Sequence, residues 1–167
     1  MDADLVTLSH AIGTAALAKN TPPTPLIVSA ESCTGGWAAQ VITHTAGSSA
    51  WFERGFVTYS NQAKIDMLGV RTETLEKFGA VSQETAAEMA TGALKNSNAL
   101  FSLAITGIAG PTGGSPGKPV GTVCFAWCRV GEKVVTETAL FAGDREAVRR
   151  QAVVHALRGL LQRLDAA

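Results

Sequence analysis

Residues 26–42 read Leu26-Ile27-Val28-Ser29-Ala30, then Glu31-Ser32-Cys33-Thr34-Gly35-Gly36, then Trp37-Ala38-Ala39-Gln40-Val41-Ile42. A short apolar run that ends at turn residues is typical of a buried strand, and residues 37–43 are expected to form a helix. A buried strand that turns into a helix at a serine and two glycines presents a hydroxyl at the sheet edge, beside free backbone N–H groups. These are the parts of an acyl-transfer site.

Helices and strands alternate along the rest of the chain. Apolar residues at helical spacing between Leu5 and Ala16 predict a first helix, which the proline-rich residues 21–25 end. Further strands are predicted over 52–60, 100–105, 120–128 and 134–141. Further helices are predicted over 61–68, from Ser82 to about residue 97, and after Asp144, with Ser82 and Asp144 as N-caps. The charged stretch 73–77 is interpreted as solvated surface.

This alternation predicts the α/β class, with a mixed or mainly parallel sheet covered by helices on both faces. Of the 167 residues, 46% are hydrophobic and 17% are charged, and this length and composition suit a single domain. Lys plus Arg number 14 and Asp plus Glu number 14, so no net field attracts nucleic acid or an anionic membrane. Neither a secretory signal nor a membrane span is expected, and the three cysteines are interpreted as reduced thiols of a cytoplasmic protein.

Ser32 is the natural candidate nucleophile, because the turn exposes its hydroxyl while Gly35 and Gly36 let backbone N–H groups approach an oxyanion. An alternative is that Ser32 or Thr34 only caps the helix that begins at Trp37. Cys33 is a rival nucleophile if the helix N-terminus lowers its pKa, and otherwise it is a small buried side chain.

A base for the serine is expected from a second strand end, Thr58-Tyr59-Ser60-Asn61-Gln62-Ala63-Lys64. A partly buried Lys64 loses its proton more readily and could take the proton of the Ser32 hydroxyl, as in Ser-Lys hydrolases. Tyr59 could relay a proton or donate one to the leaving group. The alternative is a solvated lysine beside a core tyrosine. None of the three histidines lies at a comparable strand end.

A second glycine-rich segment, residues 104–119, follows the strand over 100–105, and its glycines suit close backbone approach to a ligand. It matches neither the P-loop nor the Rossmann pattern, and the alternative is a flexible surface loop. Arg145, Arg149 and Arg150 crowd the start of the last helix, where a nearby anion would relieve their conflict with the helix dipole. The alternative is that they pair with Glu146 and other surface carboxylates.

Three motifs in this order resemble the CinA C-terminal domain family: Glu31 to Gly36, Tyr59 to Lys64, and Thr106 to Pro111. The resemblance covers nearly the whole chain, and the best-known members of the family are nicotinamide-nucleotide amidohydrolases. It implies that Ser32 is the deamidase serine, with Tyr59 and Lys64 as its catalytic partners and with no metal or other cofactor. It further implies the stand-alone form, without the additional N-terminal domain of larger members.

The expected reaction is therefore hydrolysis of the carboxamide of nicotinamide mononucleotide in the cytoplasm, which recycles pyridine nucleotide. We expect oxyanion donors around Thr34, Gly35 and Gly36. The substrate ribose or phosphate is expected at Thr106, Gly107, Ala109 and Gly110, with Arg145 as a further phosphate candidate. Two alternatives stay open: a non-catalytic nucleotide- or partner-binding module of the competence-damage type, and an amidase for another small amide. A homodimer is expected only because two-fold oligomers are common.

Overall fold

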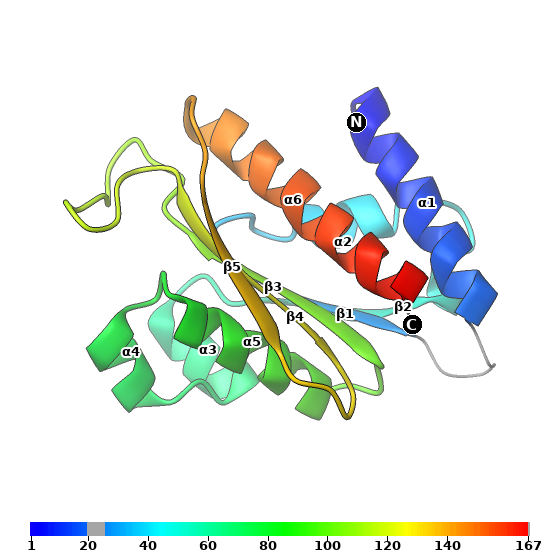
Figure 1. Cartoon of the computed structure of the whole chain (residues 1–167), viewed down its shortest axis with the longest axis horizontal. Coiled ribbons are helices and arrows are strands. Elements are labelled where there is room, and N and C mark those ends of the chain that lie inside the picture. Colours follow the sequence, from blue (N-terminus) through cyan, green and yellow to red (C-terminus); the bar gives the residue numbers. More distant parts are fainter. Residues whose placement is uncertain (20–25, 167) are drawn as a thin grey trace.

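A five-stranded sheet in the order β2-β1-β3-β4-β5 forms the middle layer of the molecule (Figure 1). The computed structural model describes residues 1–19 and 26–166, so the expected connection at 21–25 lies outside the described residues. β1 pairs in parallel with β2 and β3, whereas the β3–β4 and β4–β5 pairs are antiparallel, so the sheet is mixed. The strands are β1 (Ile27–Glu31), β2 (Phe52–Val57), β3 (Phe101–Gly107), β4 (Thr122–Arg129) and β5 (Val135–Leu140).

Helices cover both faces of the sheet, as predicted (Figure 1). One face carries α1 (Ala3–Lys19), α2 (Trp37–Ile42) and α6 (Arg145–Ala166), and the other carries α3 (Asn61–Leu68), α4 (Thr72–Phe78) and α5 (Gln83–Lys95). A short 3-10 helix (Ser48–Ala50) precedes β2. Two apolar clusters, one on each face, form the core.

β1 is buried along its whole length because both of its faces are covered. Ile27 belongs to the cluster under α1 and α6, while Val28 and Ala30 belong to the cluster under α5. This explains why its sequence is a continuous apolar run rather than an alternating one. The parallel register sets Glu31 opposite Val57 on β2 and Ile105 on β3, so the carboxyl ends of three strands meet at one edge.

The predicted strand over 52–60 is too long, because β2 ends at Val57. Ser60 instead caps α3, and its hydroxyl accepts a hydrogen bond from the Ala63 N–H at 3.0 Å. Ser82 and Asp144 are confirmed as caps, since their side chains accept from the backbone N–H groups three residues later.

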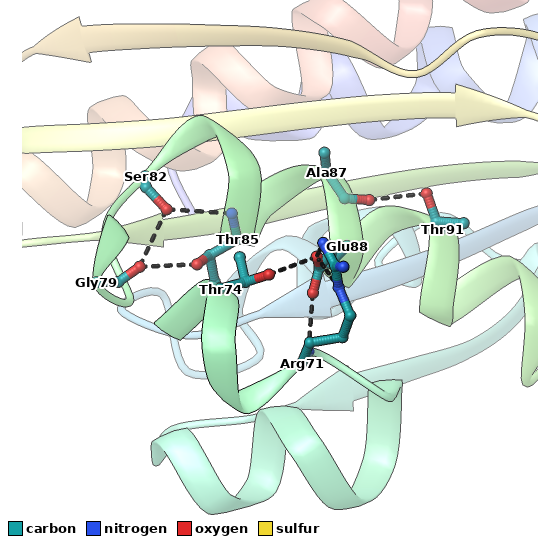
Figure 2. Close-up of polar contacts among 8 residues, drawn as sticks. All are labelled: Arg71, Thr74, Gly79, Ser82, Thr85, Ala87, Glu88 and Thr91. Atoms are coloured by element: carbon teal, nitrogen blue, oxygen red, sulfur yellow. Dashed lines mark hydrogen bonds and ion pairs between the residues drawn. The ribbon is translucent and has the colours of Figure 1, made fainter. Parts of the chain in front are cut away.

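The helix α4 is missing from the sequence prediction, which assigned residues 73–77 to solvated surface. Arg71 occupies its N-cap without a side-chain cap, so the usual start signal is absent. Figure 2 shows what holds the segment instead: Glu88 of α5 accepts hydrogen bonds from the Arg71 backbone and guanidinium and from the Thr74 hydroxyl at 2.7 Å. The Ser82 and Thr85 hydroxyls both donate to the Gly79 carbonyl, which closes the turn between α4 and α5 (Figure 2).

Candidate active site

Ser32 and Lys64 meet at the edge where β1 and β2 end. The Ser32 N–H donates to the Ile105 carbonyl on β3 at 2.9 Å, which fixes the residue directly after β1. Lys64 reaches this edge from the second turn of α3, and its Nζ lies 2.9 Å from Ser32 Oγ. The same amine donates to the Thr58 carbonyl at 2.8 Å. The Ser32 hydroxyl is therefore bonded to Lys64, and the interpretation of Ser32 as a helix cap is wrong.

The Lys64 side chain is only 1% exposed, so the interpretation of a solvated lysine is also wrong. Burial lowers the pKa of its amine below the ordinary 10.5, because the charged form loses its hydration. Among the described residues, no carboxylate lies within ion-pair distance of Nζ to reverse this effect. A neutral lysine amine has a lone pair, so this arrangement can accept the proton of the serine hydroxyl.

Glu31 is a second buried ionisable residue at this edge, and no role was predicted for it from the sequence. Its carboxylate accepts hydrogen bonds from the Thr34 hydroxyl at 2.6 Å and from the N–H groups of Gly36, Ala38 and Ala39 at 3.1, 3.0 and 2.8 Å. Glu31 thereby takes the place of an N-cap for α2, whose Gly36 cap has no side chain. The sequence signal for this role was an acidic residue, Glu31, at the end of β1 and five residues before the Gly36 cap of α2.

These bonds correct the predicted oxyanion donors in residues 32–36, which we call the Ser32 turn. The Gly36 N–H points to Glu31, and the Gly35 N–H donates to the Ser32 carbonyl at 3.0 Å, so neither is free. Within residues 1–19 and 26–166, the N–H groups of Cys33 and Thr34 have no acceptor. The two glycines are required for another reason: their φ angles of 60° and 95° lie in the left-handed region.

Cys33 is a poor rival nucleophile in this structure. Its side chain is buried, and desolvation together with the nearby Glu31 charge raises the pKa of its thiol to about 11. Because the thiolate is the reactive form, a thiol with this pKa is inert near neutral pH.

Among the described contacts, the Tyr59 side chain is hydrogen bonded to neither Ser32 nor Lys64, so its expected role as a proton relay or donor stays a prediction. Its side chain is 60% exposed, and its hydroxyl accepts a hydrogen bond from Arg145 Nη2 at 2.7 Å. Arg145 Nη1 donates to the Gly110 carbonyl at 2.8 Å. Arg145 therefore joins the strand ends of β2 and β3 across the site.

The second glycine-rich segment is packed at its start, over residues 104–110, whereas residues 111–117 are exposed. The Thr106 hydroxyl donates to the Ala80 carbonyl at 2.7 Å, and Ala109 is buried. Gly107 is needed for close packing, since a Cβ there would lie 2.7 Å from the Val123 side chain. The Thr106 hydroxyl is therefore already bonded and the Ala109 side chain already packed, and the expected contact of this turn with ribose or phosphate stays a prediction. Gly110 reaches the site through the carbonyl that holds Arg145.

A pocket of about 380 Å³ lies beside the Ser32 turn and is lined by Trp37, Asp144, Arg145, Glu146 and Arg149. Of the three arginines at the start of α6, Arg150 pairs with Asp2 and Asp4, as the surface interpretation expected. In the described part of the chain, Arg145 and Arg149 have no such carboxylate partner. Two guanidinium groups that lack a carboxylate partner suit an anionic ligand such as a phosphate.

No group of three or more metal-ligating side chains is found within residues 1–19 and 26–166. The same residues contain no helix that is long and apolar enough to cross a membrane.

The sequence profile described as the CinA C-terminal domain matches residues 9–164. The chain is 55% identical to the nicotinamide-nucleotide amidohydrolase PncC of Escherichia coli (strain K12), over 96% of this chain and 95% of that protein. It is 56% identical to the protein of the same name from Pseudomonas putida, over 81% of this chain and 84% of the other. Among solved structures, the competence/damage inducible protein CihA from Agrobacterium tumefaciens superposes with a TM-score of 0.90 at 44% identity, covering 99% and 98% of the two chains.

Proposed function

The chain belongs to the CinA C-terminal domain family, and we propose that it hydrolyses nicotinamide mononucleotide to nicotinate mononucleotide and ammonia. The relatives named as nicotinamide-nucleotide amidohydrolases support the substrate, since they match over most of both chains. The observation that carries the mechanism is the 2.9 Å hydrogen bond between Ser32 and a buried lysine that has no carboxylate partner among the described residues. An enzyme with this activity is a C–N hydrolase that acts on a linear carboxamide.

Acylation begins when the neutral Lys64 amine takes the Ser32 proton. The serine oxygen attacks the carboxamide carbon, and the carbonyl oxygen gains negative charge. The free N–H groups of Cys33 and Thr34 are the donors that stabilise this oxyanion, in place of the predicted glycine donors. One of them belongs to the residue after the nucleophile, as in other strand–turn–helix serine sites.

Collapse of this intermediate breaks the C–N bond and releases ammonia, which takes its proton from the Lys64 ammonium. We assign this step to Lys64 rather than Tyr59 because only Lys64 is hydrogen bonded to Ser32. Water then attacks the acyl-enzyme and gives one proton to Lys64, and the acid that forms loses its remaining proton to the solvent as the carboxylate product. The Ser32 oxygen regains a proton from the Lys64 ammonium, so the enzyme returns to its starting state.

The pocket beside the Ser32 turn is our candidate for the nucleotide part of the substrate. Arg145 is the proposed phosphate ligand, because its guanidinium is exposed and lines the pocket, and Tyr59 and Gly110 hold it in place. The proposal includes a cytoplasmic location in pyridine-nucleotide recycling. A homodimer remains a prediction.

Ammonia release from nicotinamide mononucleotide, nicotinamide riboside and nicotinamide tests the proposal. We expect the mononucleotide to be hydrolysed most efficiently, and we expect Ser32→Ala to lose this activity. Efficient hydrolysis of the compounds without phosphate would instead indicate an amidase for other small amides. Calorimetric binding of the mononucleotide without ammonia release would indicate a non-catalytic binding module.

A further inference from the structure

Arg149 holds the backbone of the Ser32 turn from a helix that lies far away in the sequence. Its Nε donates to the Cys33 carbonyl at 3.0 Å, and its Nη2 donates to the Thr34 carbonyl at 3.1 Å. The guanidinium carbon lies 5.6 Å from the centre of the Trp37 ring, which further restricts its orientation. We propose that Arg149 is a positioning residue for the reaction, an inference that rests on the proposed function: it sets the direction of an N–H group that donates a hydrogen bond to the developing oxyanion.

The geometry of the peptide bond connects these contacts to the oxyanion. The peptide bond between Cys33 and Thr34 is trans. In a trans peptide, the carbonyl and the N–H point in opposite directions. When Arg149 holds the Cys33 carbonyl, it therefore also fixes the direction of the Thr34 N–H, which has no acceptor among the described residues.

Arg149 and Glu31 fix different parts of the Ser32 turn. Glu31 bonds to the Thr34 hydroxyl and to N–H groups from Gly36 onward, so it anchors the start of α2. In the described part of the chain, Arg149 is the side chain that bonds to the backbone of Cys33 and Thr34. Lysine cannot reproduce this, because its point charge lacks the planar fork that reaches two carbonyl oxygens together.

A direct phosphate contact by Arg149 is the competing role, since the side chain also lines the pocket. The two roles differ in kinetics. A residue that positions the oxyanion donor affects the transition state and therefore kcat, whereas a residue that binds the phosphate equally in both states affects KM.

The test compares Arg149→Met and Arg149→Lys with Arg150→Met in the full chain. Arg150 is a matched control, because it is the next arginine on α6 but pairs with Asp2 and Asp4. For Arg149→Met we expect kcat for ammonia release to fall about a hundredfold, with KM for nicotinamide mononucleotide changed less than about threefold. Arg149→Lys should recover only part of the loss, and Arg150→Met should resemble the wild type. A raised KM with unchanged kcat in Arg149→Met would overturn the proposal.

A second measurement does not depend on the substrate assignment. A fluorophosphonate forms a bond between phosphorus and the Ser32 oxygen and releases fluoride, and its phosphoryl oxygen needs the same N–H donors. We expect Arg149→Met to slow this labelling by about the same factor, with Ser32→Ala as the blank and far-UV circular dichroism as the check on folding. Labelled wild type without ammonia release would count against the proposed substrate alone. Equal labelling rates for wild type and Arg149→Met, or no labelling of wild-type Ser32, would overturn the positioning role.

Discussion

Glu31 and Lys64 are both buried ionisable residues at the same edge of the sheet, yet their surroundings are opposite. The Glu31 carboxylate accepts hydrogen bonds from one hydroxyl and three backbone N–H groups at the start of α2. The Lys64 amine has two neutral oxygen partners, and no carboxylate in the described chain pairs with it.

This difference separates Glu31, which stabilises the structure, from Lys64, which takes part in the proposed reaction. A carboxylate that accepts hydrogen bonds from several N–H groups at a helix N-terminus holds the backbone in place. An amine that is desolvated without an opposite charge is shifted towards its neutral form, which is the form that can act as a base. Four predictions test the comparison.

The largest expected effect is on activity when Lys64 is replaced by Met. Loss of the general base should lower the rate of ammonia release about 10²–10⁴-fold. Because an apolar side chain replaces a buried amine without a charged partner, the thermal stability should stay equal or increase. Lys95→Met, at an exposed position on α5, is the control for both assays. A large loss of stability in Lys64→Met would mean that Lys64 is structural, like Glu31.

Replacement of Glu31 by Gln should act mainly on stability. The amide of glutamine would face donor groups that the carboxylate now accepts from, so the free energy of unfolding should fall by about 3 kcal/mol or more. Urea unfolding measures this change. Glu132→Gln, which removes one exposed ion pair with Arg129, should change it by about 0.5 kcal/mol or less. If Glu31→Gln and Glu132→Gln lowered the free energy of unfolding equally, Glu31 would not be the structural residue that the comparison with Lys64 requires.

The pH dependence of both kcat/KM and the free energy of unfolding should follow the protonation of Lys64. Because its pKa is lowered in the folded protein, kcat/KM should rise with pH up to tenfold per unit and level off below pH 10.5. Between the lowered pKa and 10.5, the unfolded chain binds more protons than the folded one, so the free energy of unfolding relative to Lys64→Met should rise with pH. A relative stability that falls with pH in this window would contradict the assignment.

The smallest effect is expected for Cys33→Ala. A buried thiol with a raised pKa has no part in the proposed chemistry, so ammonia release should stay within about twofold of the wild type. Stability should fall by about 1 kcal/mol for the lost packing. Abolished activity in a folded Cys33→Ala would restore Cys33 as the nucleophile.

The sequence was informative where a motif matches a local physical rule. The apolar run before Ser32 and the position of Lys64 in the helix after the second strand together predicted that these two side chains meet at one edge of the sheet. Of the three expected oxyanion donors, Thr34 keeps an N–H without an acceptor in the described chain, whereas the Gly35 N–H donates to the Ser32 carbonyl and the Gly36 N–H to Glu31. The role of Glu31 was missed because its side chain reaches backbone groups up to eight residues later. The hydrogen-bond partners of Tyr59 and Thr106 could not be predicted for a related reason: Arg145 and Ala80 are distant in sequence.

The most direct test of the central claim is an NMR titration of the lysine side chains labelled with ¹³C at Cε, with the Lys64 signal assigned by its loss in Lys64→Met. We predict that the pKa of Lys64 lies below 10.5 and coincides with the rising limb of kcat/KM for ammonia release. A Lys64 amine that titrates at or above 10.5 would contradict the claim that burial without a counter-ion makes it the base for Ser32.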